Sequence, residues 1–122
     1  MNNLFVYGTL MQGHSRNSVI NRFEWSPAVL YGYKRHLPER LGYPFIVPHK
    51  ESKVEGEVYF SVDEETLEIV DKIEGEGELY HRIKVTVHLL ESKEQTNLSV
   101  TKGDICEAWT FLAGEWLISQ FI

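Results

Sequence analysis

A turn that follows the first apolar run of the chain has the residue types of an anion-binding site. The run at residues 4–6 leads directly into Tyr7, Gly8, Thr9 and Leu10. Gly8 has no Cβ, so a ligand can approach the main chain closely there. The successive N–H groups of Gly8, Thr9 and Leu10 can converge on a carboxylate or on a developing oxyanion. Taken alone, the same pattern also fits an ordinary tight turn with Tyr7 as a half-buried aromatic residue.

Glu74 is the candidate for acid–base chemistry. It follows a predicted helix, and a carboxylate at a helix C-terminus meets the partial negative charge of the helix dipole, which raises its pKa. Partial burial acts in the same direction. A carboxyl group whose pKa approaches neutrality can take a proton and return it. From local sequence alone, Glu74 also fits a solvated acidic loop, because Glu76 and Glu78 follow it between glycines.

Short motifs occur in a fixed order along the chain. They are Tyr7-Gly8-Thr9-Leu10, Asn17, Gly42-Tyr43-Pro44, Val70-Asp71-x-x-Glu74 and Tyr80-x-Arg82. Their order and spacing resemble the gamma-glutamylcyclotransferase-like family, in particular its gamma-glutamylamine cyclotransferase branch. The resemblance extends from residue 4 to about residue 116. It implies that the sheet closes into a small barrel flanked by helices.

The resemblance also implies a role for each motif. Glu74 is the last residue of the family's Leu-Asp-x-x-Glu pattern, which makes it the catalytic acid and base, and Val70 replaces the usual leucine conservatively. The turn at residues 7–10 corresponds to the family's cradle, whose main-chain groups hold the glutamyl part of the substrate. Tyr43 and Tyr80 are further substrate-binding candidates, although Tyr80 also fits a residue packed on the sheet edge.

Arg82 has a structural interpretation rather than a binding one. We predict that it pairs with Asp71 or with a loop glutamate and so fixes the end of the helix. Glu76 and Glu78 match no fixed position of the family. We interpret both as loop residues that add like charge near Glu74.

The activity that the resemblance implies is a cyclisation without a cofactor. The free α-amine of a γ-glutamyl group attacks its own γ-carbonyl, expels an amine or amino acid, and closes the ring of 5-oxoproline. The α-amine has a reference pKa of about 8, so a base must remove a proton before the attack. Because the nucleophile is tethered, orientation can supply about 7–11 kcal/mol of the barrier. The alternative is a non-catalytic module of the same fold that binds a small acidic or aminoacyl ligand.

The composition fits one domain that spans residues 1–122 and has no nucleic-acid partner. Hydrophobic residues make up 43% of the chain and charged residues 25%, which is ordinary for a globular protein. The formal charge of −6 and the scattered basic residues argue against binding a phosphate backbone. The five histidines show no metal-ligand spacing, so we predict no metal site. Cys106, the single cysteine, lies in an apolar run and is predicted to be a small buried strand residue.

The N-terminus has no feature of a signal peptide or membrane anchor. The apolar run there ends within a few residues, well short of the roughly 18–20 needed to span a bilayer. We therefore expect a cytoplasmic protein with no membrane partner. We expect it to be a monomer or a weak homo-oligomer, with a small γ-glutamyl compound as its substrate.

Alternating strands dominate the elements that must position these residues. In residues 53–60, Val54, Gly56, Val58 and Phe60 alternate with Glu55, Glu57 and Tyr59, which predicts a half-buried strand. Residues 81–89 alternate in the same way, and residues 28–37 and 105–112 are weaker strand candidates. Residues 45–47 form a possible short strand between two prolines that limit its pairing.

One helix is well defined in the sequence. Ser61 or Asp63 supplies its N-cap, apolar residues recur on one face, and it should end near residues 74–75. We also predict a shorter helix at residues 15–23, a terminal turn at 115–121 and a long polar hairpin loop at 91–103. Strands outnumber helices and follow one another, so the fold class is α+β with a mainly antiparallel sheet.

Overall fold

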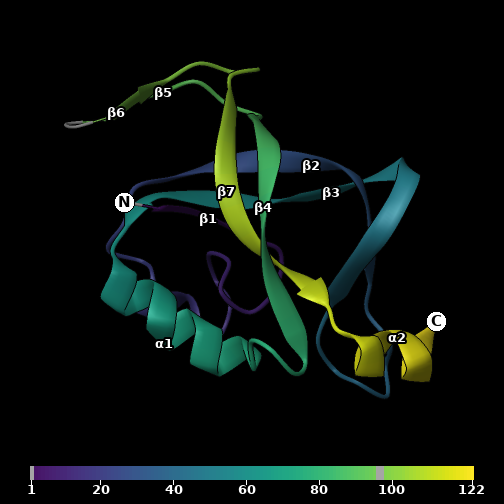
Figure 1. Cartoon of the computed structure of the whole chain (residues 1–122). Helices are drawn as coiled ribbons and strands as arrows, with labels where there is room; N and C mark the ends of the chain where they lie inside the picture. The colour runs from purple at the N-terminus through teal and green to yellow at the C-terminus, as the bar shows by residue number, and fades with distance from the viewer. Residues whose placement is uncertain (1, 96–97) are drawn as a thin grey trace.

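A closed five-stranded barrel forms the centre of the computed structural model, which describes residues 2–95 and 98–122 (Figure 1). The barrel strands are β1 (Asn2–Val6), β2 (Trp25–His36), β3 (Phe45–Val62), β4 (Tyr80–Leu89) and β7 (Ile105–Ala113). They close in the order β1-β3-β2-β4-β7. The β1–β7 pair is parallel, and the other pairs are antiparallel. The predicted α+β class with a mainly antiparallel, barrel-like sheet is therefore confirmed.

Strand β3 is longer than the sequence predicted. Residues 45–47 and 53–60 were expected to be separate strands, but they belong to one strand of 18 residues that pairs with β2 along most of its length. Pro48 does not end it. Strand β1 pairs with β3 only over residues 57–62, so the part that contains Pro48 has β2 on one side and no β1 on the other. A proline is tolerated at such an edge because its missing N–H is not needed there.

Both faces of β1 are buried. Phe5 packs in a cluster with Val58 and Val87, whereas Leu4 and Val6 pack in a second cluster with residues of a helix. Successive side chains of a strand point to opposite faces, so a strand buried on both faces reads as the continuous apolar run seen in the sequence. This central position fixes the point at which the chain leaves β1 and enters the turn at residues 7–10.

Helix α1 (Glu64–Glu74) confirms the helix predicted in the sequence. The side chain of Asp63 accepts a hydrogen bond from the Thr66 N–H at 2.7 Å, which is an N-cap contact. Its buried face contributes Leu67 and Val70 to the core. The helix ends because Gly75 takes the left-handed conformation, with φ +65°, that a residue with a Cβ adopts only with strain. Glu74 is consequently the last helical residue.

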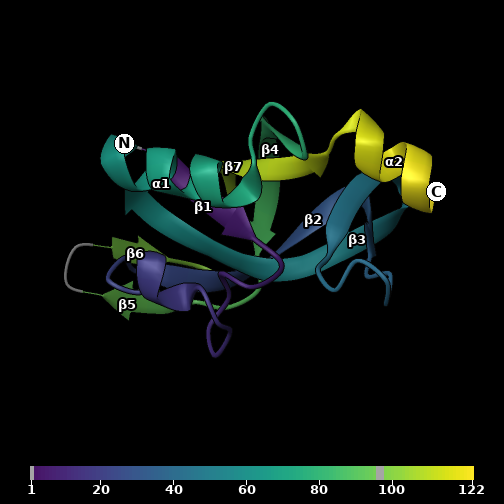
Figure 2. The same cartoon turned by 90° about the horizontal axis from the view of Figure 1, so that it is seen from below.

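Helix α1 and the short helix α2 (Glu115–Phe121) lie along the same side of the barrel (Figures 1 and 2). The sequence predicted only a terminal turn at α2. The helix predicted at residues 15–23 is reduced to the 3-10 turn η1 (Asn17–Val19), because the Asn17 side chain bonds to residues outside the segment. The predicted hairpin loop at 91–103 contains two short paired strands, β5 (Lys93–Gln95) and β6 (Leu98–Val100), and its residues 96–97 lie outside the described residues.

Candidate active site

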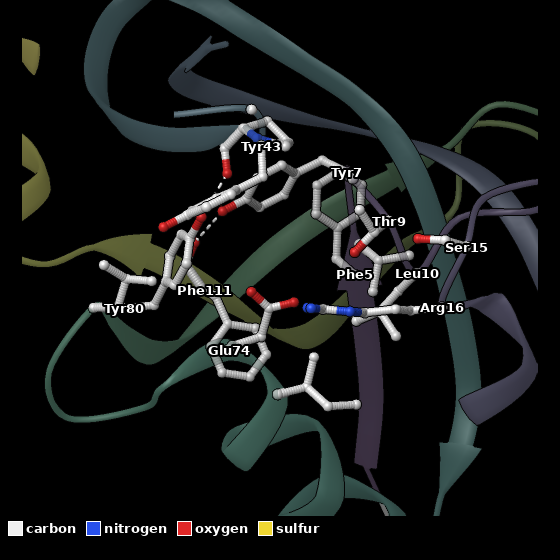
Figure 3. Close-up of a pocket in the computed structure, with 16 residues that line it drawn as sticks. Phe5, Tyr7, Thr9, Leu10, Ser15, Arg16, Tyr43, Glu74, Tyr80 and Phe111 are labelled. Atoms are coloured by element: carbon white, nitrogen blue, oxygen red, sulfur yellow. Dashed lines mark hydrogen bonds between the residues drawn. The ribbon is translucent and has the colours of Figure 1, made fainter. Parts of the chain in front are cut away.

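A cavity of about 410 Å³ opens where the turn after β1, the end of α1 and the start of β4 meet (Figure 3). The sequence-predicted site residues all line it: Tyr7, Gly8, Thr9, Leu10, Tyr43, Glu74 and Tyr80. Residues separated by more than 60 positions therefore face one space. Tyr80 lines the cavity wall, which excludes the alternative that it packs only on the sheet edge.

The turn presents three successive main-chain donors. The Met11 N–H donates to the Gly8 carbonyl at 3.0 Å and closes the turn. Within the described part of the chain, no group accepts a hydrogen bond from the N–H of Gly8, Thr9 or Leu10. Buried or half-buried main-chain donors are nearly always paired, so three unused ones beside a cavity are suited to an anionic ligand.

Gly8 is required by close packing against the opposite wall. A Cβ at this position would lie 2.9 Å from Cγ of Pro44, closer than real side chains approach. The bare main chain of the turn therefore fits directly against the segment that carries Tyr43. The absence of a Cβ at Gly8 serves packing here as well as the access of a ligand to the main chain.

A partly buried polar network holds the turn in place. The Glu57 carboxylate accepts hydrogen bonds from the Gln12 N–H at 2.8 Å and from the Tyr59 hydroxyl at 3.0 Å. The Asn17 amide donates to the Leu10 carbonyl at 2.8 Å and to the Tyr59 hydroxyl at 2.9 Å. Burial raises the pKa of Tyr59 to about 12, so its hydroxyl stays protonated and can donate to Glu57.

No sequence pattern indicated this network. The alternation of residues 53–60 placed Glu57 and Tyr59 on the polar face of a half-buried strand, but both side chains are buried. The turn covers the β3 face that carries these two side chains. The alternation separated the two faces of the strand correctly, but it could not indicate that the turn covers the polar one. We call Glu57, Tyr59 and Asn17 the turn bracket.

Glu74 points its carboxylate into the cavity (Figure 3). The side chain is half-buried, and this burial raises the pKa of Glu74 to about 6 from an ordinary value of 4.5. The positive charge of Arg16 acts in the opposite direction and lowers it. A carboxyl group with this pKa is ionised at neutral pH and still basic enough to accept a proton.

The tyrosine hydroxyls of the cavity are already bonded to the wall. The Tyr7 hydroxyl donates to the Phe111 carbonyl, and the Tyr80 hydroxyl donates to the Pro44 carbonyl at 2.6 Å. Burial raises the pKa of both hydroxyls, so they act as neutral donors. The half-buried Tyr43 ring is tilted against Tyr80, with centroids 6.5 Å apart. These rings shape the cavity, and Glu74 remains its candidate acid and base.

Arg82 has the structural role that the sequence predicted. Its Nε lies 3.4 Å from Oδ1 of Asp71 in the last turns of α1. Its main-chain N–H donates to Glu76 at 3.2 Å, so Glu76 ties the loop after α1 to β4. Its guanidinium also lies over the Trp109 ring, 4.6 Å from the centroid. These contacts hold the end of the helix and thereby the place of Glu74.

Arg16 is a cavity residue that the sequence analysis did not identify. The indication that the sequence offered for Arg16 is that it directly precedes Asn17, one of the matched motifs. Cys106 is only partly buried, which corrects the predicted burial, and that burial raises the pKa of its thiol. Over residues 2–95 and 98–122, no group of three His, Cys, Asp or Glu side chains is arranged to hold a metal ion. No helix in the same ranges is long and apolar enough to cross a membrane.

Residues 4–120 match the family described as "Gamma-glutamyl cyclotransferase, AIG2-like". Protein AIG2 C of Arabidopsis thaliana is 34% identical over 119 residues, which cover 93% of this chain and 68% of that protein. The crystal structure of an AIG2-like protein from Mus musculus superposes with a TM-score of 0.73 at 25% identity, covering 96% of this chain and 82% of that one.

A more distant structure, titled "Gamma-glutamyl cyclotransferase", has a TM-score of 0.69 at 18% identity and covers 93% of this chain and 66% of that one. At that identity the likeness concerns the fold alone. The chain spans about two thirds of the length of several Arabidopsis relatives, from 62% to 72%.

Proposed function

Because this chain belongs to the AIG2-like gamma-glutamyl cyclotransferase family, we propose that it converts a γ-glutamyl amine, amino acid or peptide into 5-oxoproline and the free amine. One observation carries the proposal. The cavity joins three unused main-chain donors of the turn to a half-buried carboxyl group at Glu74. The first can hold an anionic part of a substrate, and the second can move a proton.

The reaction is a proton transfer coupled to an intramolecular attack. Glu74 takes a proton from the α-ammonium group of the substrate. The freed nitrogen forms a bond to the γ-carbon, and the bond from that carbon to the leaving nitrogen breaks. Glu74 returns this proton to the leaving nitrogen. The attacking nitrogen loses a second proton as it becomes the lactam N–H, and that proton ends on the released amine, so the carboxylate is regenerated and no other reactant is consumed. A pKa near 6 suits both transfers, because it lies within a few units of the amine and of neutral pH.

The rest of the barrier is lowered by shape. The γ-glutamyl chain must fold so that its amine approaches its own γ-carbonyl, and well-oriented attacks of this kind gain about 7–11 kcal/mol. The buried rings of Tyr7, Tyr80 and Phe111 give the cavity rigid walls, and both tyrosine hydroxyls are fixed to main-chain carbonyls. We assign the substrate α-carboxylate to the N–H groups of Gly8, Thr9 and Leu10.

Replacement of Glu74 by Gln tests the proposal. The variant keeps the shape and loses the base, so release of 5-oxoproline from γ-glutamyl-alanine should fall by about 100-fold or more. Glu78→Gln is the matched control, because Glu78 is an exposed carboxylate of the following loop and does not line the cavity. Its turnover should match the unmodified protein.

Two outcomes would contradict the proposal. Undiminished turnover by Glu74→Gln would remove Glu74 from the reaction. A rise in melting temperature with γ-glutamyl compounds, without any 5-oxoproline from the unmodified protein, would instead indicate the non-catalytic binding module.

A further inference from the structure

Arg16 is fixed to the turn by the main chain around it. Its own N–H donates to the Thr9 carbonyl at 2.8 Å. The next residue, Asn17, donates from its side chain to the Leu10 carbonyl at 2.8 Å and to the Tyr59 hydroxyl at 2.9 Å. The turn bracket that holds the cavity donors therefore also fixes the point from which the Arg16 side chain extends.

The Arg16 side chain extends along the cavity toward Glu74 (Figure 3). Arg16 is exposed, so its guanidinium lies at the solvent side of the cavity. The buried side chains of Tyr7 and Tyr80 form the inner wall. The positive charge of Arg16 acts to lower the pKa of both Glu74 and Tyr80. Among the described residues that line the cavity, it is the only cation.

The guanidinium of Arg16 has no hydrogen-bond or ion-pair partner among the described residues. No described side chain or carbonyl accepts a hydrogen bond from it, and no described carboxylate lies within ion-pair distance. By contrast, Arg22, Arg35, Arg40 and Arg82 each donate to a named partner or form an ion pair. A guanidinium presents a planar fork of donors that matches the two oxygens of a carboxylate.

The position beside Glu74 identifies which carboxylate Arg16 would meet. Glu74 protonates the leaving nitrogen in the proposed reaction, so the carbon attached to that nitrogen lies next to Glu74 and toward the solvent side. The α-carboxylate of the glutamyl part is already assigned to the N–H groups of the turn. A carboxylate in the leaving group would add a negative charge near Glu74, and Arg16 is the lining cation that can neutralise it.

We propose that Arg16 makes this protein select γ-glutamyl α-amino acids, whose leaving group carries a carboxylate beside the scissile nitrogen, over γ-glutamyl derivatives of neutral amines. The inference rests on the proposed function, and it adds a specificity residue and a substrate class to it. Arg16 contacts the leaving group and takes no part in the proton transfers.

The test compares two substrates that differ in one group. γ-Glutamyl-alanine and γ-glutamyl-ethylamide share the glutamyl part and the leaving nitrogen, and only the former has the second carboxylate. The measured quantity is the ratio of their kcat/KM values within each variant, so any change common to both substrates cancels. The assays run at pH 8, well above the pKa of Glu74.

The ratio should favour γ-glutamyl-alanine in the unmodified protein and fall by about tenfold or more in Arg16→Gln, as expected for losing a hydrogen-bonded charge. Arg16→Lys keeps the positive charge but lacks the planar fork of donors. Its kcat/KM ratio should lie between those of the unmodified protein and Arg16→Gln. Arg40→Gln is the matched control, because Arg40 contacts Gln120 and Phe121 outside the cavity. An unchanged ratio in Arg16→Gln would overturn the inference.

A binding experiment separates this inference from the proposed function. In the Glu74→Gln background, calorimetry measures the Kd of both compounds without turnover. A Kd ratio that favours γ-glutamyl-alanine and falls by about tenfold on adding Arg16→Gln supports the inference, even if the unmodified protein releases no 5-oxoproline. An unchanged Kd ratio, or no measurable binding of either compound, overturns it.

Discussion

Glu74 differs from the glutamates that follow it because the end of α1 turns its side chain inward. Glu76 and Glu78 are exposed, and Glu76 is engaged with the main chain of β4. Glu74 instead faces the cavity, where loss of water raises its pKa to about 6. Of these three carboxylates within five positions, only that of Glu74 lies in the cavity. The end of α1 and the Gly75 turn direct it there, and the other two remain exposed.

The pH profile of kcat/KM should show this pKa. Glu74 must be ionised to take a proton, so kcat/KM should rise with pH through about 6 and approach a plateau before the substrate amine titrates near 8. Arg16 lowers the pKa of Glu74, so Arg16→Gln should move the rising limb to higher pH. A rising limb near 4.5, or one that Arg16→Gln does not move, would contradict the assigned environment of Glu74.

At this scale the sequence was informative where residue type alone limits the chemistry. The glycine of the turn and the carboxylate at a predicted helix end were both identified, and the structure puts them in one cavity. Arg16 was missed because a lone exposed arginine has no chemical pattern of its own, and its position directly before Asn17 was the only indication in the sequence. Its position depends on hydrogen bonds that the Arg16 N–H and the Asn17 side chain donate to the carbonyls of Thr9 and Leu10, and no periodicity predicts these bonds.

At the scale of elements, the turn depends on β3. The turn bracket connects the buried face of this strand to the main chain directly after the three donors, at the Leu10 carbonyl and the Gln12 N–H. The sequence separated the two faces of β3 correctly and assigned one of them to solvent. A strand alternation cannot reveal that a loop from elsewhere in the chain covers its polar face.

Glu57→Ala should damage both stability and activity. The change leaves the buried Tyr59 hydroxyl and the partly buried Gln12 N–H without their acceptor, which costs about 1–3 kcal/mol. The turn would also lose its attachment, so KM for a γ-glutamyl substrate should rise. Urea denaturation and steady-state kinetics measure the two effects.

Glu55→Ala is the control for this prediction. Glu55 lies on the same strand two residues earlier and is exposed. Both its stability and its KM should match those of the unmodified protein. If Glu57→Ala behaved like Glu55→Ala, the turn bracket would not position the cavity donors.

At the scale of the whole molecule, barrel closure gathers the site. Parallel pairing of β1 with β7 joins Leu4 to Trp109, so the first strand lies among segments from the far end of the chain. The turn after β1, the end of α1 and the start of β4 consequently meet on one side (Figures 1 and 3). Pattern alone predicted the strands and their antiparallel character. The closure of the barrel was predicted only from the family resemblance, because no local sequence pattern indicates which distant strands pair.

The central claim is that the turn and Glu74 act on one substrate in one cavity, and a crystal structure of Glu74→Gln with γ-glutamyl-alanine tests it most directly. The claim predicts the glutamyl α-carboxylate on the N–H groups of Gly8, Thr9 and Leu10, with the leaving nitrogen beside residue 74. A ligand bound away from the turn, or a residue 74 side chain directed into bulk water, would contradict it.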